Sequence, residues 1–159
     1  MYPPAFRPSR IRPAVNLVAN TSIMFRNVVV AIVALLVFFA CVMLGDGAST
    51  SMFPAPAGLD LTNAESIRAY MEQVPLSCFL VMMLGHAIGA FLAGFIVARF
   101  TRDKDGRLGS GSTALIVGGM ITLGGVVNLA MIPHPGWFWS DALIYSVFMF
   151  IGYRMGSRR

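Results

Sequence analysis

The stretch LGHAIGAFLAG, at residues 84–94, reads as the middle of a membrane helix, yet it contains a histidine. It lies inside an uncharged apolar run over residues 74–98, and a helix needs only about 20 residues to cross a bilayer. Glycine and alanine let membrane helices approach closely. Such small residues recur here in two series at four-residue spacing, and they include Gly85, Gly89, Ala93 and Gly94. This segment is therefore predicted to pack tightly against a neighbouring helix.

The composition places the chain in a membrane. Of its 159 residues, 57% are hydrophobic and only 12% are charged, and the mean hydropathy is +0.73. A soluble domain has about a quarter of its residues charged, so this chain has too little polar surface to coat a globule in water. The net charge of +5 does not indicate nucleic-acid binding, because the basic residues sit in short flanks around apolar runs.

Four apolar runs predict an all-α membrane protein. They cover about residues 27–44, 74–98, 111–132 and 137–153. Each run lacks period-2 alternation, and a single chain of this length cannot close a barrel, so each is predicted to be a transmembrane helix. We expect a single four-helix transmembrane domain over residues 27–159. Small residues that include Gly118 predict a tight central hairpin between the second and third spans.

The basic residues predict the orientation. In a four-span topology, every Lys and Arg except Arg68 falls on one side, whereas the loop between the first two spans is acidic. Cationic loops stay on the cytoplasmic side. We therefore expect a protein of the bacterial inner membrane with both termini in the cytoplasm.

Two segments are expected outside the bilayer. Residues 1–26 are rich in Pro and Arg, which predicts an extended cytoplasmic arm that sets the topology or docks on a partner. The stretch GDGASTSMFPAPAG is expected to be irregular. A short amphipathic helix is predicted at about residues 63–73, with Thr62 as its N-cap, Glu65 completing a capping box, and a bend at Pro75.

His86 is the candidate buried polar residue of the second span. Counted from the outer boundary, it lies at a depth similar to that of Thr122 in the third span. An interhelical hydrogen bond that fixes packing is one reading. The others are a ligand of a metal or porphyrin, a chlorophyll-type magnesium included, and a proton relay. The cofactor, if any, stays unknown.

A second polar group is expected at the outer end. Asn128, His134 and Asp141 are predicted at or near one depth there, with Trp137 in an aromatic belt. Asp141 could accept a hydrogen bond from Tyr145, and a carboxylate in the first turn of a helix is also favoured by the helix dipole. Two readings of these residues therefore stay open: a purely structural role, and a shallow outer-facing binding site formed by Asn128, His134 and Asp141.

The cysteines and histidines predict no metal site that they share. Cys41 and Cys78 are expected to be free thiols, although a disulfide between the first two spans is conceivable. No cysteine pair has zinc spacing, and the two histidines are predicted at different depths.

The segments GHAIGAFLAGFIVAR and GGVVNLAMIPHPGWFWSDALIY resemble an uncharacterised bacterial family of small four-helix integral membrane proteins, marked by a His-Ala-x-Gly helix and a Pro-x-Pro-x-Trp-Phe turn. The resemblance covers residues 66–152 and implies the four-span fold. It brings no activity. It nominates His86, Asn128, Pro133, Pro135, Trp137 and Asp141.

The function expected from these features is that of a non-enzymatic membrane protein, an accessory or structural subunit of a larger membrane complex. Its expected partners are membrane lipids and other subunits or further copies of itself, and no nucleic acid. The alternative is a small oligomeric transporter or channel with a polar path near His86. A third reading is a membrane enzyme that uses His134 and Asp141.

Overall fold

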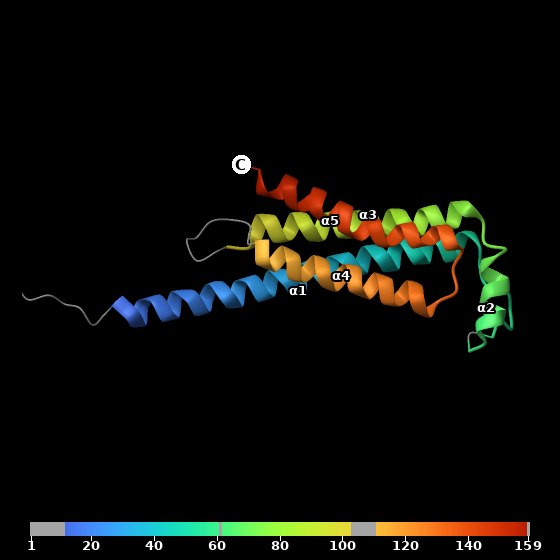
Figure 1. Cartoon of the computed structure of the whole chain (residues 1–159), viewed down its shortest axis with the longest axis horizontal. Coiled ribbons are helices and arrows are strands. Elements are labelled where there is room, and N and C mark those ends of the chain that lie inside the picture. Colours follow the sequence, from blue (N-terminus) through green and yellow to red (C-terminus); the bar gives the residue numbers. More distant parts are fainter. Residues whose placement is uncertain (1–11, 61, 103–110, 159) are drawn as a thin grey trace, which may run out of the picture.

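The structure is a computed structural model that describes residues 12–60, 62–102 and 111–158. These residues form helices joined by turns, and the long helices run side by side along one axis (Figure 1). The short helix α2 lies across one end of the bundle, which we call the α2 end. The elements are α1 (Arg12–Met52), α2 (Ala64–Met71), α3 (Leu76–Phe100), α4 (Gly111–Met131), the 3-10 helix η1 (Gly136–Ser140) and α5 (Asp141–Ser157).

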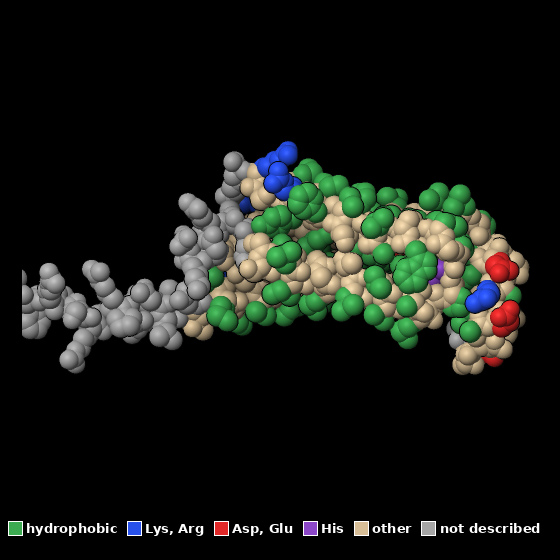
Figure 2. All heavy atoms as spheres, in the orientation of Figure 1, with side chains coloured by type: hydrophobic (Ala, Val, Ile, Leu, Met, Phe, Trp, Pro, Cys, Tyr) green, Lys and Arg blue, Asp and Glu red, His purple; other side chains and the backbone are tan. Residues whose placement is uncertain are grey.

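Three helices are long and apolar enough to span a membrane: Thr21–Met52 of α1, all of α3 and all of α4. The predicted all-α fold is therefore confirmed for the described residues, and the three apolar helices are consistent with a membrane protein. The run at residues 137–153 is divided, because η1 takes up its start and α5 continues from Asp141 for 17 residues. The type of side chain on the visible face changes along the axis of the bundle. Hydrophobic groups cover the middle of the bundle, and acidic ones gather at the α2 end (Figure 2).

Helix α1 is much longer than the predicted span at residues 27–44. It has 41 residues and begins at Arg12, so residues 12–26 are helical and the prediction of an extended arm is wrong for them; residues 1–11 lie outside the described residues. Pro13 is compatible with this start because proline fits the first turn of a helix. No proline follows until Pro54, and the helix continues to Met52 through most of a stretch that was expected to be irregular.

The cap of α2 differs from the predicted one. The Asn63 side chain accepts hydrogen bonds from the Glu65 and Ser66 amides at 2.9 and 3.3 Å, so Asn63 is the N-cap. Thr62 instead directs its amide and hydroxyl to the Asp60 carboxylate, at 2.8 and 2.7 Å. The helix itself falls within the predicted range. Thr62 and Asn63 are both good capping residues, and the turn at Asp60 decides between them.

Helix α3 packs along α1 on one side and along α5 on the other. A Cβ atom on Gly85 would lie 2.9 Å from the Cys41 carbonyl oxygen of α1. A Cβ atom on Gly94 would overlap the Met149 carbonyl of α5, and one on Gly152 would overlap the Phe91 carbonyl of α3. The predicted small-residue packing of the second span is thus present, and it joins α3 to two helices.

The predicted tight hairpin between the second and third spans is wrong. Helix α4 contacts its neighbours over a much smaller surface than α3 does. A Cβ atom on Gly118 would meet only the Met149 side chain, at 3.4 Å, and one on Gly119 or Gly124 would meet nothing within 4 Å. Both series of small residues on α3 are already occupied by α1 and α5, so α4 packs at the side of this three-helix core.

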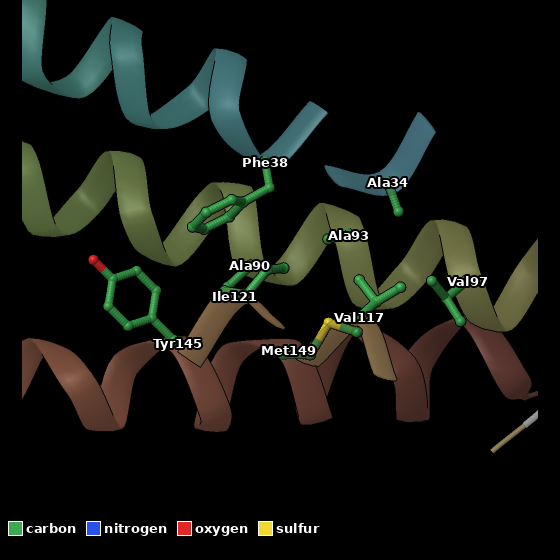
Figure 3. Close-up of a cluster of buried hydrophobic side chains, with 9 residues drawn as sticks. All are labelled: Ala34, Phe38, Ala90, Ala93, Val97, Val117, Ile121, Tyr145 and Met149. Atoms are coloured by element: carbon green, nitrogen blue, oxygen red, sulfur yellow. The ribbon is translucent and has the colours of Figure 1, made fainter. Parts of the chain in front are cut away.

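Two apolar clusters lie at different heights in the bundle. The main apolar cluster joins four helices: Ala34 and Phe38 from α1, Ala90, Ala93 and Val97 from α3, Val117 and Ile121 from α4, and Tyr145 and Met149 from α5 (Figure 3). The upper apolar cluster, closer to the α2 end, consists of Phe79, Leu129 and Phe138. Cys41 and Cys78 are free thiols, as predicted.

Polar contacts fix α1 against α3 at the end opposite α2. The Arg26 guanidinium donates to the Phe100 carbonyl at 2.7 and 3.1 Å. The Asn27 amide pairs with the backbone of Arg102 in both directions, at 2.7 and 3.0 Å. These side chains satisfy backbone groups where α3 ends, and they set the register of α1 along α3.

Candidate functional site

His86 is surrounded by polar groups from three helices. Its Nδ1 atom lies 2.7 Å from Oδ2 of Asp141 on α5 and 3.1 Å from the hydroxyl of Tyr145. Its Nε2 atom faces Oδ1 of Asp46 on α1 at 3.6 Å, which is too long for a direct hydrogen bond. We call these four residues the His86 cluster. An imidazole with a carboxylate beside each ring nitrogen is the central feature of the site.

The close crossing of α1 and α3 places Asp46 beside His86. Gly45 and Gly85 precede these residues directly, and a Cβ atom on Gly45 would lie 3.0 Å from the Gly85 Cα atom. Only glycine permits this distance between the two backbones. The close approach of Gly45 and Gly85 therefore brings α1 and α3 near enough for Asp46 to face His86.

Asp141 is positioned by the turn between η1 and α5. It is the first residue of α5, and the positive end of the helix dipole stabilises a carboxylate there. Pro135 is the N-cap of η1, and the 3-10 turn that follows carries the chain back into the bundle. The prediction that Asp141 stands in the first turn of a helix is confirmed, and its carboxylate points to His86.

Burial separates the members of the cluster. The side chains of Asp141 and His86 are 0% and 5% exposed, whereas the Asp46 side chain is 36% exposed. Oδ1 of Asp141 and Oδ1 of Asp46 are buried and have no hydrogen-bond partner. A buried polar atom without a partner is costly, so these two oxygens mark where a further group can bind.

Apolar side chains enclose the cluster along the bundle axis. The upper apolar cluster lies toward the α2 end, and the main apolar cluster lies on the other side. Tyr145 belongs to the main apolar cluster and also to the His86 cluster, because its ring packs on Phe38 while its hydroxyl reaches His86. Of the two carboxylates beside the ring, only Asp46 is partly exposed, so it is the one that groups outside the bundle can reach.

The predicted site residues are brought together only in part. His86 and Asp141 form one site, although they were assigned to two. Thr122 does not contact His86, and its hydroxyl lies 3.2 Å from that of Ser146. Asn128 is exposed, and His134 bonds through Nδ1 to the Ile132 carbonyl at 2.6 Å. The outer site proposed for Asn128, His134 and Asp141 is therefore not formed.

Sequence reasoning missed Asp46 altogether. It was counted as a loop residue because the first span was expected to end at residue 44. With α1 extended to Met52, Asp46 lies six residues inside the helix, about 9 Å from its end. The absence of proline before Pro54 was the signal that could have placed it inside the bundle.

The chemistry that the cluster supports is proton exchange. Among the described residues, no group of three His, Cys, Asp or Glu side chains is arranged to hold a metal ion. Both ring nitrogens of His86 face side-chain oxygens, which leaves neither open to an axial ligand of a porphyrin. An imidazole and a carboxylate at hydrogen-bond distance, as His86 and Asp141 are at 2.7 Å, can pass a proton between them.

A groove lies between α4 and α5, apart from the His86 cluster. Its volume is about 550 Å³. Its lining is mostly apolar, and the polar side chains in it are those of Thr122, Ser146 and Tyr153. The other lining residues include Gly118, Gly119, Met149 and Phe150.

Comparison with protein-family models, curated proteins and solved structures gave no match to this chain. The resemblance to a four-helix family therefore stays a prediction. Of the residues it nominated, Pro133 lies in the turn after α4, and the Trp137 ring packs edge-on against Phe79 with 5.4 Å between centroids.

His134 should titrate below the usual range of histidine. Its burial lowers its pKa below 6.5, and the ring stacks on Phe138 with 4.9 Å between centroids. Because the folded state favours the neutral ring, the stability from this group is fully present above about pH 6.5 and declines as pH falls below it. The chain has two histidines, so imidazole nitrogen NMR of wild type and His134→Gln assigns both. A midpoint at or above 6.5 for His134 would contradict the burial argument.

Proposed function

We propose that this chain is a non-enzymatic, four-span protein of the bacterial inner membrane, with both termini in the cytoplasm, that serves as a structural or accessory subunit of a larger membrane complex. With η1 before it, α5 approaches the length of a span and is the fourth one. The distribution of Lys and Arg supports the orientation. The observation that carries the subunit proposal is the groove beside α4.

Helix α4 is a poorly covered element on a well-packed core. Leu115, which lines the groove, is 79% exposed, and the α4 glycines Gly119 and Gly124 face open space. In a membrane, the groove must be filled by lipid tails or by another helix. Glycine-lined surfaces favour helices because backbones can approach one another closely there. A partner helix seated along α4 and α5 would complete the bundle.

A photo-crosslinking amino acid at position 115 tests this proposal in native membranes. The matched control is the same amino acid at position 36, because Leu36 is also exposed but lies on α1, away from the groove. We expect one protein adduct of defined mass from position 115 and only lipid adducts from position 36. A second copy of this chain in the adduct would show self-association. Lipid adducts alone from both positions would contradict the subunit proposal.

A small oligomeric transporter or channel is the second candidate. The observation that favours it is the partial exposure of Asp46, which connects the buried His86 to the surface of the bundle. A purified, partner-free homo-oligomer whose vesicles show an ion flux that is lost in His86→Gln would support this candidate. No flux from wild-type vesicles would remove it.

A further inference from the structure

The His86 cluster carries more ionic charge than its surroundings can stabilise. If both carboxylates are ionised, the cluster has a net charge of −2 with a neutral imidazole and −1 with an imidazolium. Apolar clusters lie on both sides, and Asp141 is fully buried. An uncompensated charge in such a place is costly, and binding a cation reduces the cost.

The position of the unpartnered oxygens indicates where that cation binds. Oδ1 of Asp141 accepts no hydrogen bond, although its carboxylate is 0% exposed and its other oxygen is 2.7 Å from His86. Oδ1 of Asp46 also lacks a partner. The described residues provide no three-ligand metal site. A proton needs only one acceptor atom, and each of these carboxylate oxygens is one.

We propose that the His86 cluster is a binding site for one exchangeable proton, which enters at Asp46 and is held on Asp141. This inference does not rest on the subunit proposal. In the starting state, neutral His86 carries its proton on Nδ1 and donates it to Oδ2 of Asp141. A proton from water binds Asp46, and it passes to Nε2 once the Asp46 side chain has closed the 3.6 Å gap to hydrogen-bond distance. The ring then releases its Nδ1 proton to Asp141, so Asp46 is again ionised, His86 is again neutral, and Asp141 is a neutral acid. The cluster gains one proton.

Tyr145 is placed to stabilise both states. Its hydroxyl lies 3.1 Å from Nδ1 of His86. A hydroxyl can donate or accept, so it can share the Nδ1 proton as an acceptor and can turn its own proton toward Nδ1 when that nitrogen carries none. A group with only donors or only acceptors lacks this freedom.

The groups that face His86 come from each neighbouring element. Helix α1 contributes Asp46, and α5 contributes Asp141 and Tyr145. The turn before η1 carries His134, and α4 has no charged residue in its sequence. The only acidic groups in contact with the ring are therefore Asp46 and Asp141 within the described part of the chain.

Infrared difference spectroscopy of the full-length protein in vesicles, between about pH 7 and about pH 4, tests the site. We expect the wild type to show a carboxylic-acid C=O band with the position of a buried acid, and Asp141→Asn to lose it. Asp60→Asn is the matched control, because Asp60 lies in the outer turn and is fully exposed, and it should retain the band. Asp46→Asn should retain the final amplitude but respond more slowly after a pH jump.

The same band in wild type and folded Asp141→Asn would overturn the proposal. If Asp141→Asn does not fold, imidazole nitrogen NMR of the wild type decides. The proposed transfer moves the ring proton of His86 from Nδ1 to Nε2, so both nitrogen signals should change as pH falls. Signals of His86 that stay constant over this range would overturn the proposal as well.

Discussion

Replacing Gly94 by alanine should lower the free energy of unfolding of the bundle by about 3 kcal/mol, the upper range for an overpacked core. A methyl group at this position would overlap the Met149 carbonyl and would also lie 2.9 Å from the Tyr153 amide nitrogen. Both are backbone atoms of α5, so no side chain can rotate away to make room. The two helices must separate, and their contact along the crossing is lost.

The matched control uses a glycine of another membrane helix. Gly119→Ala introduces the same methyl group into α4, where nothing lies within 4 Å of the new atom. We expect no loss of stability from it, and a small gain in helix propensity. Unfolding of the two variants in mixed micelles, followed by circular dichroism, measures the difference. Equal effects of Gly94→Ala and Gly119→Ala would show that the α3–α5 crossing is looser than the structure indicates.

The two glycines also show what sequence reasoning can and cannot reach in this fold. Four-residue spacing of small residues predicted that the second span is a packing helix, and Gly85, Gly89 and Gly94 do meet neighbouring helices. The spacing says which face of a helix is small, but not which partner lies against it. Glycines in α4 suggested a hairpin with α3, yet two other helices already cover both small faces of α3. Only the three-dimensional arrangement distinguishes a packed glycine from an uncovered one.

The His86 cluster shows a second limit of the same kind. His86 and Asp141 could be singled out because ionisable groups are rare in apolar spans. Their pairing could not, because depth counted along separate helices assumes equal boundaries. Asp141 begins α5, whereas His86 lies ten residues into α3, about 15 Å along its axis. Helix α5 starts deeper in the bundle, and the η1 turn occupies the space above it.

Replacing His86 by alanine should cost about 3–5 kcal/mol of unfolding free energy, because it leaves the Asp141 carboxylate buried without a partner. Asp141 is 0% exposed, and Oδ2 of its carboxylate is held at 2.7 Å from the His86 ring. Removing Asp141 as well, in His86→Ala/Asp141→Ala, should recover a large part of that loss, since the uncompensated charge is gone. The measurement is a double-mutant cycle that includes Asp141→Ala, by unfolding in mixed micelles near neutral pH.

Thr122→Ala provides the comparison, because it breaks a different polar contact, between α4 and α5. The Thr122 hydroxyl lies 3.2 Å from that of Ser146, and neither group is charged, so its loss should cost about 0.6 kcal/mol. A buried carboxylate held by an imidazole and a neutral hydroxyl pair thus differ in the cost of leaving one member behind. If the losses from His86→Ala and Asp141→Ala simply add in the double variant, the two side chains are not coupled, and the carboxylate does not depend on the imidazole for its stability inside the bundle.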